Sequence, residues 1–158
     1  HGSVFSLVLR AVGDVPDDVE MRPILSIPVA GRATRVLYIE DNPANMNLMR
    51  RIVGLREGTT LDLADDGASG LQLALANPPD LILLDLHLPD IPGEDVLRRL
   101  RASRQTAEVP VVVVTADASA PARRRALDLG ASGVVLKPVD VAQVLAWVDD
   151  PTGRRFEP

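Results

Sequence analysis

Five residues with side chains suited to acid–base, metal or phosphate chemistry follow short apolar segments of the chain. The run LILL at 81–84 ends on Asp85, and three other runs end at Glu40-Asp41, Thr115 and Lys137. Simpler explanations exist, because an acid can end a strand or cap a helix and a lysine can be a solvated charge. If the runs are parallel strands, however, their carboxyl ends meet at the sheet edge where open α/β sheets bind ligands. We therefore expect these side chains to converge in one cleft.

The charges of such a cluster restrict what it can bind. Two carboxylates ~4 Å apart repel each other by about 4 kcal/mol at an effective dielectric constant of about 20. A hard divalent cation that prefers oxygen ligands, such as Mg²⁺, relieves this repulsion. Lys137 adds a compact positive charge that suits a phosphoryl oxygen. A cation, an ammonium and a hydroxyl around one carboxylate are the groups that phosphoryl transfer to that carboxylate requires.

Strand and helix patterns alternate along the chain and predict the elements that position these residues. We expect strands at 35–39, 60–64, 80–84, 109–114 and 133–136, and helices near 43–56, 67–76, 93–103, 120–129 and 140–149. This alternation predicts an α/β fold with a doubly wound, five-stranded parallel sheet flanked by five helices, of the flavodoxin-like type. A barrel would need eight such units.

Helical spacing of apolar residues predicts which helix faces are buried. Pro43 suits the first turn of a helix, and Gly130 is placed to end the fourth helix. The predicted buried faces consist of Met46, Met49, Ile52 and Val53 in the first helix, Val96, Leu97 and Leu100 in the third, and Val144, Leu145 and Val148 in the fifth.

Composition excludes several classes of protein. The chain has 158 residues and no cysteine, so disulfides and thiolate metal sites are excluded. No apolar run approaches the ~18–20 residues that span a bilayer, and no signal peptide is visible. We therefore expect a cytoplasmic location without direct membrane contact from this fragment, while a membrane-tethered parent protein stays open. The net charge of −5 argues against nucleic acid as a partner. Nothing in the sequence indicates an oligomeric state.

The segments YIEDNP, LLDLHLPDIPG, VVVVTA and GVVLKP together resemble the motifs of the receiver domain of two-component response regulators. The resemblance covers residues 34–150, and its motifs fall at the spacing of the family. It implies that Asp85 accepts a phosphoryl group from a phosphohistidine on a histidine kinase or a histidine phosphotransfer protein. Thr115 would then bond one phosphoryl oxygen, and Lys137 would pair with another.

The same resemblance implies a set of ligands for Mg²⁺. Asp41 and Asp85 would bind the ion directly, together with the backbone carbonyl of His87, while Glu40 would act mainly through water. In the family, the positions that His87 and Asp117 occupy tune hydrolysis of the phosphoryl group, which would make the domain dephosphorylate itself. The His87 side chain itself is expected to be exposed.

One position departs from the pattern of the family. The aromatic residue of the fifth strand that usually changes its rotamer with the threonine is Val134 here. The departure casts doubt on the usual output mechanism but not on phosphorylation.

Residues 2–10, GSVFSLVLR, carry a second and shorter resemblance, to the last strand pair of a histidine-kinase ATP-binding domain; a Gly-Ser cloning scar is the alternative. If the resemblance holds, the chain is the C-terminal receiver of a hybrid histidine kinase. We therefore expect a kinase remnant at 1–12, a linker at 13–33, the receiver at 34–150 and a tail at 151–158.

Three other functions compete with phosphoacceptance. A phosphatase or phosphotransferase of the haloacid dehalogenase type also uses an Asp after a strand, but it needs a second acid where this chain has His87. A nucleotide-binding Rossmann module is disfavoured because no Gly-rich loop follows the first strand. A degenerate receiver that only binds protein is disfavoured by Asp85, Thr115 and Lys137, although Val134 gives it some weight.

Overall fold

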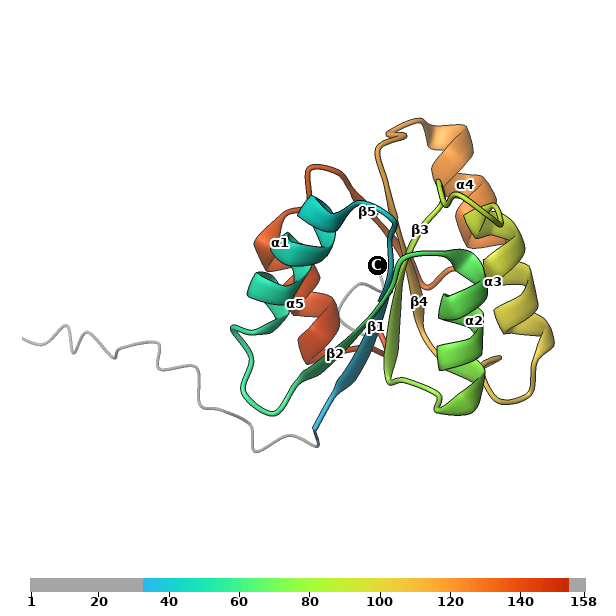
Figure 1. Ribbon diagram of the computed structural model, residues 1–158. Helices are drawn as coiled ribbons and strands as arrows, with labels where there is room; N and C mark the ends of the chain where they lie inside the picture. The colour runs from blue at the N-terminus through green and yellow to red at the C-terminus, as the bar shows by residue number, and fades with distance from the viewer. Residues whose placement is uncertain (1–32, 154–158) are drawn as a thin grey trace, which may run out of the picture.

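The computed structural model describes residues 33–153, which form a parallel sheet of five strands flanked by five helices (Figure 1). The strand order is β2-β1-β3-β4-β5, and every neighbouring pair is parallel. The predicted fold class is therefore confirmed. The strands are β1 (Arg35–Ile39), β2 (Thr60–Ala64), β3 (Leu81–Asp85), β4 (Val111–Thr115) and β5 (Gly133–Leu136).

The five helices also agree with the expected ranges to within three residues at either end. They are α1 (Pro43–Val53), α2 (Gly67–Ala76), α3 (Gly93–Ala102), α4 (Ala120–Asp128) and α5 (Val141–Asp149). Gly130 has a φ of +94°, and the amides of Gly130 and Ala131 bond the carbonyls of Leu127 and Ala126. This is the Schellman arrangement, so the predicted end of the fourth helix is confirmed.

Two strands lie later in the chain than their apolar runs suggested. β3 is Leu81–Asp85 rather than 80–84, and β4 is Val111–Thr115 rather than 109–114. Pro110 has no N–H to donate to the sheet, and β4 begins directly after it. As a result Asp85 and Thr115 are the last residues of their strands, where the sheet fixes their backbone.

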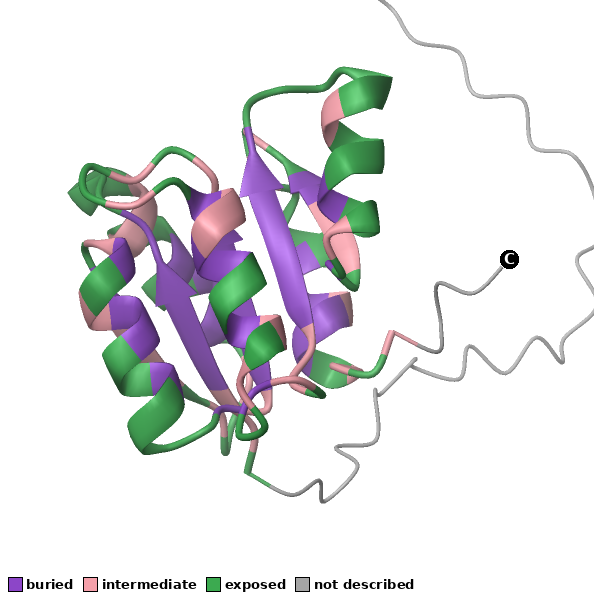
Figure 2. Ribbon diagram, turned by 90° about the vertical axis from the view of Figure 1, so that its right-hand side faces the viewer, coloured by how far each residue is buried: buried purple, intermediate pink, exposed green. Residues whose placement is uncertain are grey.

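Alternate side chains of each strand point to opposite faces of the sheet. One face, with Val36, Tyr38 and Leu83 among others, packs against α1 and α5. The other, with Ile39 and Leu84 among others, packs against α2, α3 and α4. The inner strands β1, β3 and β4 are accordingly buried, the edge strands β2 and β5 are mostly half-buried, and the helices expose one side (Figure 2).

The buried helix faces follow the prediction at every position but one. The expected residues of α3 and α5 are buried, as are Met49, Ile52 and Val53 in α1. Met46, one turn nearer the start of α1, is only half-buried.

The predicted kinase remnant at 1–12 and almost all of the predicted linker at 13–33 lie outside the described residues, as does the end of the tail. Within residues 33–153, no helix combines the length and apolar character needed to cross a membrane.

The start of α3 lies directly against the end of β3. A Cβ atom on Gly93 would lie 2.3 Å from the Asp85 carbonyl oxygen and 2.6 Å from the Leu86 Cα. Both contacts are with backbone, which cannot rotate away as a side chain could.

We expect Gly93→Ala to lower the free energy of unfolding by about 1–3 kcal/mol or more, since overpacking displaces the backbone at the end of β3. Urea denaturation measures the loss. Gly54→Ala is the matched control, because Gly54 ends α1 with an ordinary right-handed φ of −62° and a Cβ there would come no nearer to the backbone than 3.0 Å, at the Arg50 carbonyl oxygen. This variant should stay within about 1 kcal/mol of the unmodified chain. Equal stability of the two variants would contradict the close approach.

Candidate active site

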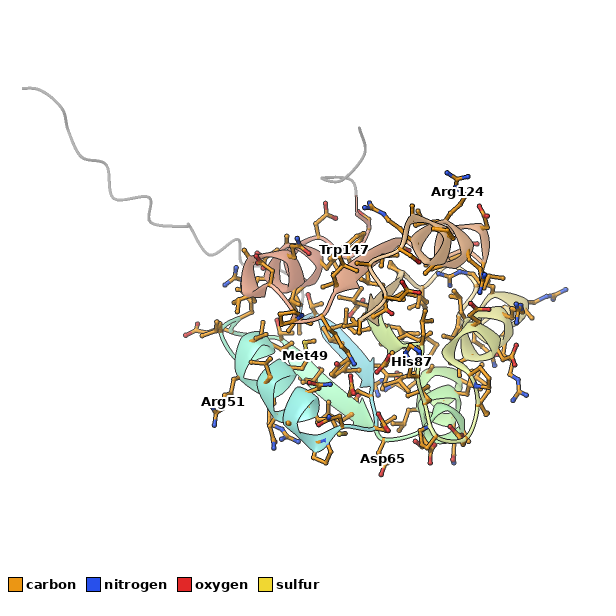
Figure 3. All side chains as sticks on the ribbon, turned by 90° about the horizontal axis from the view of Figure 1, so that it is seen from above. Met49, Arg51, Asp65, His87, Arg124 and Trp147 are labelled. Carbon is orange, nitrogen blue, oxygen red and sulfur yellow. The ribbon has the colours of Figure 1, made fainter. Side chains whose placement is uncertain are left out.

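The carboxyl edge of the sheet carries all five residues that the sequence placed in one cleft. Glu40 and Asp41 follow β1, Asp85 and Thr115 end β3 and β4, and Lys137 follows β5. Because β1, β3, β4 and β5 are consecutive neighbours in the sheet, the four strand ends lie side by side. Figure 3 is seen from above relative to Figure 1 and looks onto this edge.

Three carboxylates converge at this edge. Ligand oxygens of Glu40, Asp41 and Asp85 all lie within 4.8 Å of one another. Glu40 and Asp85 are 1 % and 4 % exposed, whereas Asp41 is exposed to solvent. Two buried carboxylates this close repel each other strongly in a medium of low dielectric constant, so the fold has to supply positive charge.

Lys137 supplies that charge between the two buried acids. Its Nζ lies 2.7 Å from Glu40 Oε2 and 2.6 Å from Asp85 Oδ2. The Lys137 backbone N–H donates to the Thr115 carbonyl at 2.8 Å, which fixes the start of the side chain beside β4. Burial alone would lower the pKa of Lys137, but the hydrogen bonds to Asp85 and Glu40 outweigh it and hold that pKa above its usual value.

Both carboxylate oxygens of Glu40 accept hydrogen bonds from the protein. Its Oε2 accepts from the Tyr38 hydroxyl at 2.6 Å as well as from Lys137, while Oε1 accepts from Asn45 Nδ2 at 3.0 Å and from the Asn42 amide at 3.2 Å. Burial raises the pKa of Glu40, yet the bonds from Lys137, Tyr38 and Asn45 leave it below its usual value. Burial, and then the bond to Glu40, raise the pKa of Tyr38.

Tyr38 and Asn45 were not among the residues that the sequence singled out. Tyr38 precedes Glu40 by two positions and so lies on the same face of the sheet, which is a signal that could have found it. Asn45 is in the first turn of α1, and only its side-chain direction reveals the contact with Glu40.

Thr115 and Asp117 lie on the β4 side of the cluster. Thr115 is fully buried, and its Oγ1 accepts the Asp117 amide at 3.1 Å. The Asp117 carboxylate is exposed and accepts the Ser119 amide at 2.8 Å, where α4 begins. Bonds from Ser119 lower the pKa of Asp117. Asp117 therefore lies at the rim of the cluster, and its carboxylate faces the start of α4.

His87 lies on the other rim of the same cluster, in the loop after β3. Its side chain is 77 % exposed, as expected, and Nδ1 lies 3.9 Å from Asp85 Oδ1. The His87 amide donates to that same oxygen at 3.0 Å. The contact ties the loop to the Asp85 side chain.

The donor set fits a hard divalent cation. Three carboxylates present oxygen ligands, which Mg²⁺ prefers. Each Glu40 oxygen already accepts two hydrogen bonds from the protein, which occupies the acceptor positions of a carboxylate. Asp41 and Asp85 are therefore the residues that would hold the ion directly.

Comparison with known proteins shows which family the chain belongs to. The family model of the response regulator receiver domain matches residues 36–149. Among curated proteins, the DNA-binding dual master transcriptional regulator RpaA of Synechocystis is 39 % identical over 114 residues, covering 72 % of this chain and 47 % of RpaA. The transcriptional regulatory protein CusR of Escherichia coli is 36 % identical over 115 residues, covering 72 % of this chain and 49 % of CusR. The chain thus spans about half the length of these relatives.

Solved structures share the fold. A putative response regulator from Chloroflexus aurantiacus has a TM-score of 0.72 at 23 % identity and covers 78 % of this chain and 100 % of its own. The receiver domain of sensor histidine kinase PA1611 from Pseudomonas aeruginosa, solved with a magnesium ion coordinated in its active site cleft, has a TM-score of 0.69 at 27 % identity, covering 77 % and 98 %. The chain described here therefore belongs to the response regulator receiver domains of two-component signal transduction.

Proposed function

We propose that this domain accepts a phosphoryl group on Asp85 from a phosphohistidine of a histidine kinase or a histidine phosphotransfer protein. The observation that carries the proposal is the state of Asp85: a buried carboxylate at a strand end, bonded to Lys137 and grouped with two more acids. A carboxylate that served only to end a strand would not need an ion pair with Lys137, which follows β5.

In the proposed step, a carboxylate oxygen of Asp85 attacks phosphorus as the phosphorus–nitrogen bond of the phosphohistidine breaks. A phosphorus–oxygen bond forms, and the imidazole leaves with the electron pair and takes up a proton. Lys137 Nζ, already beside Asp85, neutralises charge on a phosphoryl oxygen. The Thr115 hydroxyl would donate to another oxygen. Mg²⁺, held by Asp41, Asp85 and the His87 carbonyl, would supply further positive charge to the transferred group.

The rim residues suit a second role, in the lifetime of the phosphoryl group. His87 and Asp117 flank Asp85 and Thr115 and are exposed, so they meet water that approaches the acyl phosphate. We propose that both tune its hydrolysis. Glu40 would act on the metal mainly through water, because its own oxygens are occupied by protein donors.

The response to phosphorylation cannot use a ring at position 134. Val134 is half-buried and packs against the core on the sheet face that α2, α3 and α4 cover. A phosphoryl group shifts a conformational equilibrium only through contacts that differ between two states. We expect the response to concentrate in the loops at 86–92 and 115–120. Val134 is also the one observation that favours the second candidate, a receiver that binds a protein partner without phosphotransfer.

The kind of parent protein is a further part of the proposal. Residues 2–10 are what supports a hybrid histidine kinase, and they lie outside the described residues. The curated relatives cited above are named as transcriptional regulators rather than hybrid kinases. The expectation that this chain binds no nucleic acid therefore concerns the receiver alone and stays a prediction, as does its cytoplasmic location.

We expect Asp85→Asn to abolish formation of an acyl phosphate with acetyl phosphate and Mg²⁺, because the amide keeps the shape but removes the nucleophile. Acid-stable, base-labile labelling of the protein measures it. Asp65→Asn is the matched control, since Asp65 is an exposed acid just beyond β2 at the same sheet edge and should label normally. Equal labelling of both variants would refute the assignment, and no labelling of the unmodified chain would favour the protein-binding alternative.

We expect Asp41→Ala to weaken Mg²⁺ binding by about tenfold or more, because it removes a direct carboxylate ligand. Glu40→Gln should weaken it much less, since Glu40 does not contact the ion directly. Titration with Mg²⁺, followed by amide chemical shifts, measures both affinities. An unchanged affinity in Asp41→Ala would rule out this ligand set.

A further inference from the structure

The loop between β3 and α3, residues 86–92, is tied to the start of another helix. Asp90 Oδ1 accepts the Gly67 amide at 2.7 Å, and Oδ2 accepts the Ala68 amide at 2.8 Å. Gly67 and Ala68 are the first two residues of α2, whose amides have no partner within the helix. One carboxylate from the loop therefore completes two hydrogen bonds of α2, which packs beside α3 (Figure 1).

A second carboxylate bonds the same helix end from the chain that leads into the helix. Asp66, the residue before α2, accepts the Ser69 amide at 2.6 Å. Both acids stabilise α2 through its amides and its dipole. Desolvation raises the pKa of Asp90, but the hydrogen bonds from the Gly67 and Ala68 amides leave that pKa below its usual value. The two acids differ in that Asp90 comes from a different element and Asp66 from the chain leading into α2.

The loop that Asp90 ties down begins at the reactive carboxylate. The His87 amide donates to Asp85 Oδ1 at 3.0 Å, and the Gly93 amide donates to the Leu86 carbonyl at 3.0 Å. These bonds fix the two ends of the loop, and Asp90 adds a polar anchor to α2 between them. The anchor matters for the metal because the His87 carbonyl belongs to this loop.

We propose that Asp90 is a positioning residue for the phosphoacceptor site: by binding the first two amides of α2, it fixes the loop that presents the His87 backbone to the metal and to Asp85. The proposal rests on the proposed function, which supplies the role of Asp85 and the metal. The proposal gives Asp90, in the segment LPDIPG, a role in holding the site. Neither the charge of Asp90 nor its position in the sequence indicates that role.

Asp90→Ala and Asp66→Ala, made in the full chain, form a matched pair that tests the proposal. Each removes a carboxylate that caps α2, so both should lose similar stability. Asp90→Ala should weaken Mg²⁺ binding by about tenfold, as expected when a residue that orients a ligand is removed, whereas Asp66→Ala should stay within about twofold of the unmodified chain. Asp90→Asn keeps one acceptor oxygen and should fall between Asp90→Ala and the unmodified chain.

A metal-free measurement separates this inference from the proposed function. Without metal, hydrogen exchange at the His87 amide should become faster in Asp90→Ala but not in Asp66→Ala, because only the former releases the loop. Equal His87 exchange and equal Mg²⁺ affinity in the two variants would overturn the inference. An unmodified chain that binds no Mg²⁺ would instead overturn the proposed function, and the exchange measurement would still decide the role of Asp90.

Discussion

The pairing of one ammonium with two buried carboxylates is the interaction on which the rest of this structure depends. Glu40 and Asp85 are almost fully buried, and Lys137 bonds both of them. Removing either acid from water is expensive, and mutual repulsion adds to that cost. The lysine makes the arrangement stable, and the same arrangement keeps a carboxylate available at a strand end. Stability and reactivity are therefore set by the same three side chains.

This constraint explains why parts of the chain that are far apart in sequence meet around the cluster. Lys137 is 97 residues from Glu40 and 52 from Asp85 in sequence, so only the sheet order can bring the three together. The Lys137 amide bonds the end of β4, and Gly93 lets α3 begin against the end of β3. Asp90 then joins the loop after β3 to α2. The surrounding elements thus hold the cluster from several sides, through contacts in which at least one partner is the backbone.

The sequence predicted the fold class and the convergence of Glu40, Asp41, Asp85, Thr115 and Lys137, because a strand-end position in a parallel sheet determines where a side chain lies. It missed Tyr38, Asn45 and Asp90. Their contacts depend on which way a side chain turns and on which loop lies opposite, and neither follows from hydrophobic period. The predicted carboxyl ends of β3 and β4 were one residue too early. An apolar run does not show that the hydrogen-bonded ladder continues into a polar residue.

The central claim is that Lys137 makes the burial of the two acids possible, and the free energy of unfolding of Lys137→Met tests it most directly. Methionine keeps much of the length and removes the charge. Removing one partner of a buried ion pair costs roughly 3–5 kcal/mol, and because Lys137 is 20 % exposed we expect about 3 kcal/mol in EDTA. Added Mg²⁺ should then stabilise the variant more than the unmodified chain. Two acids without their lysine attract the cation more strongly, and tighter binding to the native state adds more stability. Equal stability of the two proteins in EDTA would contradict the account.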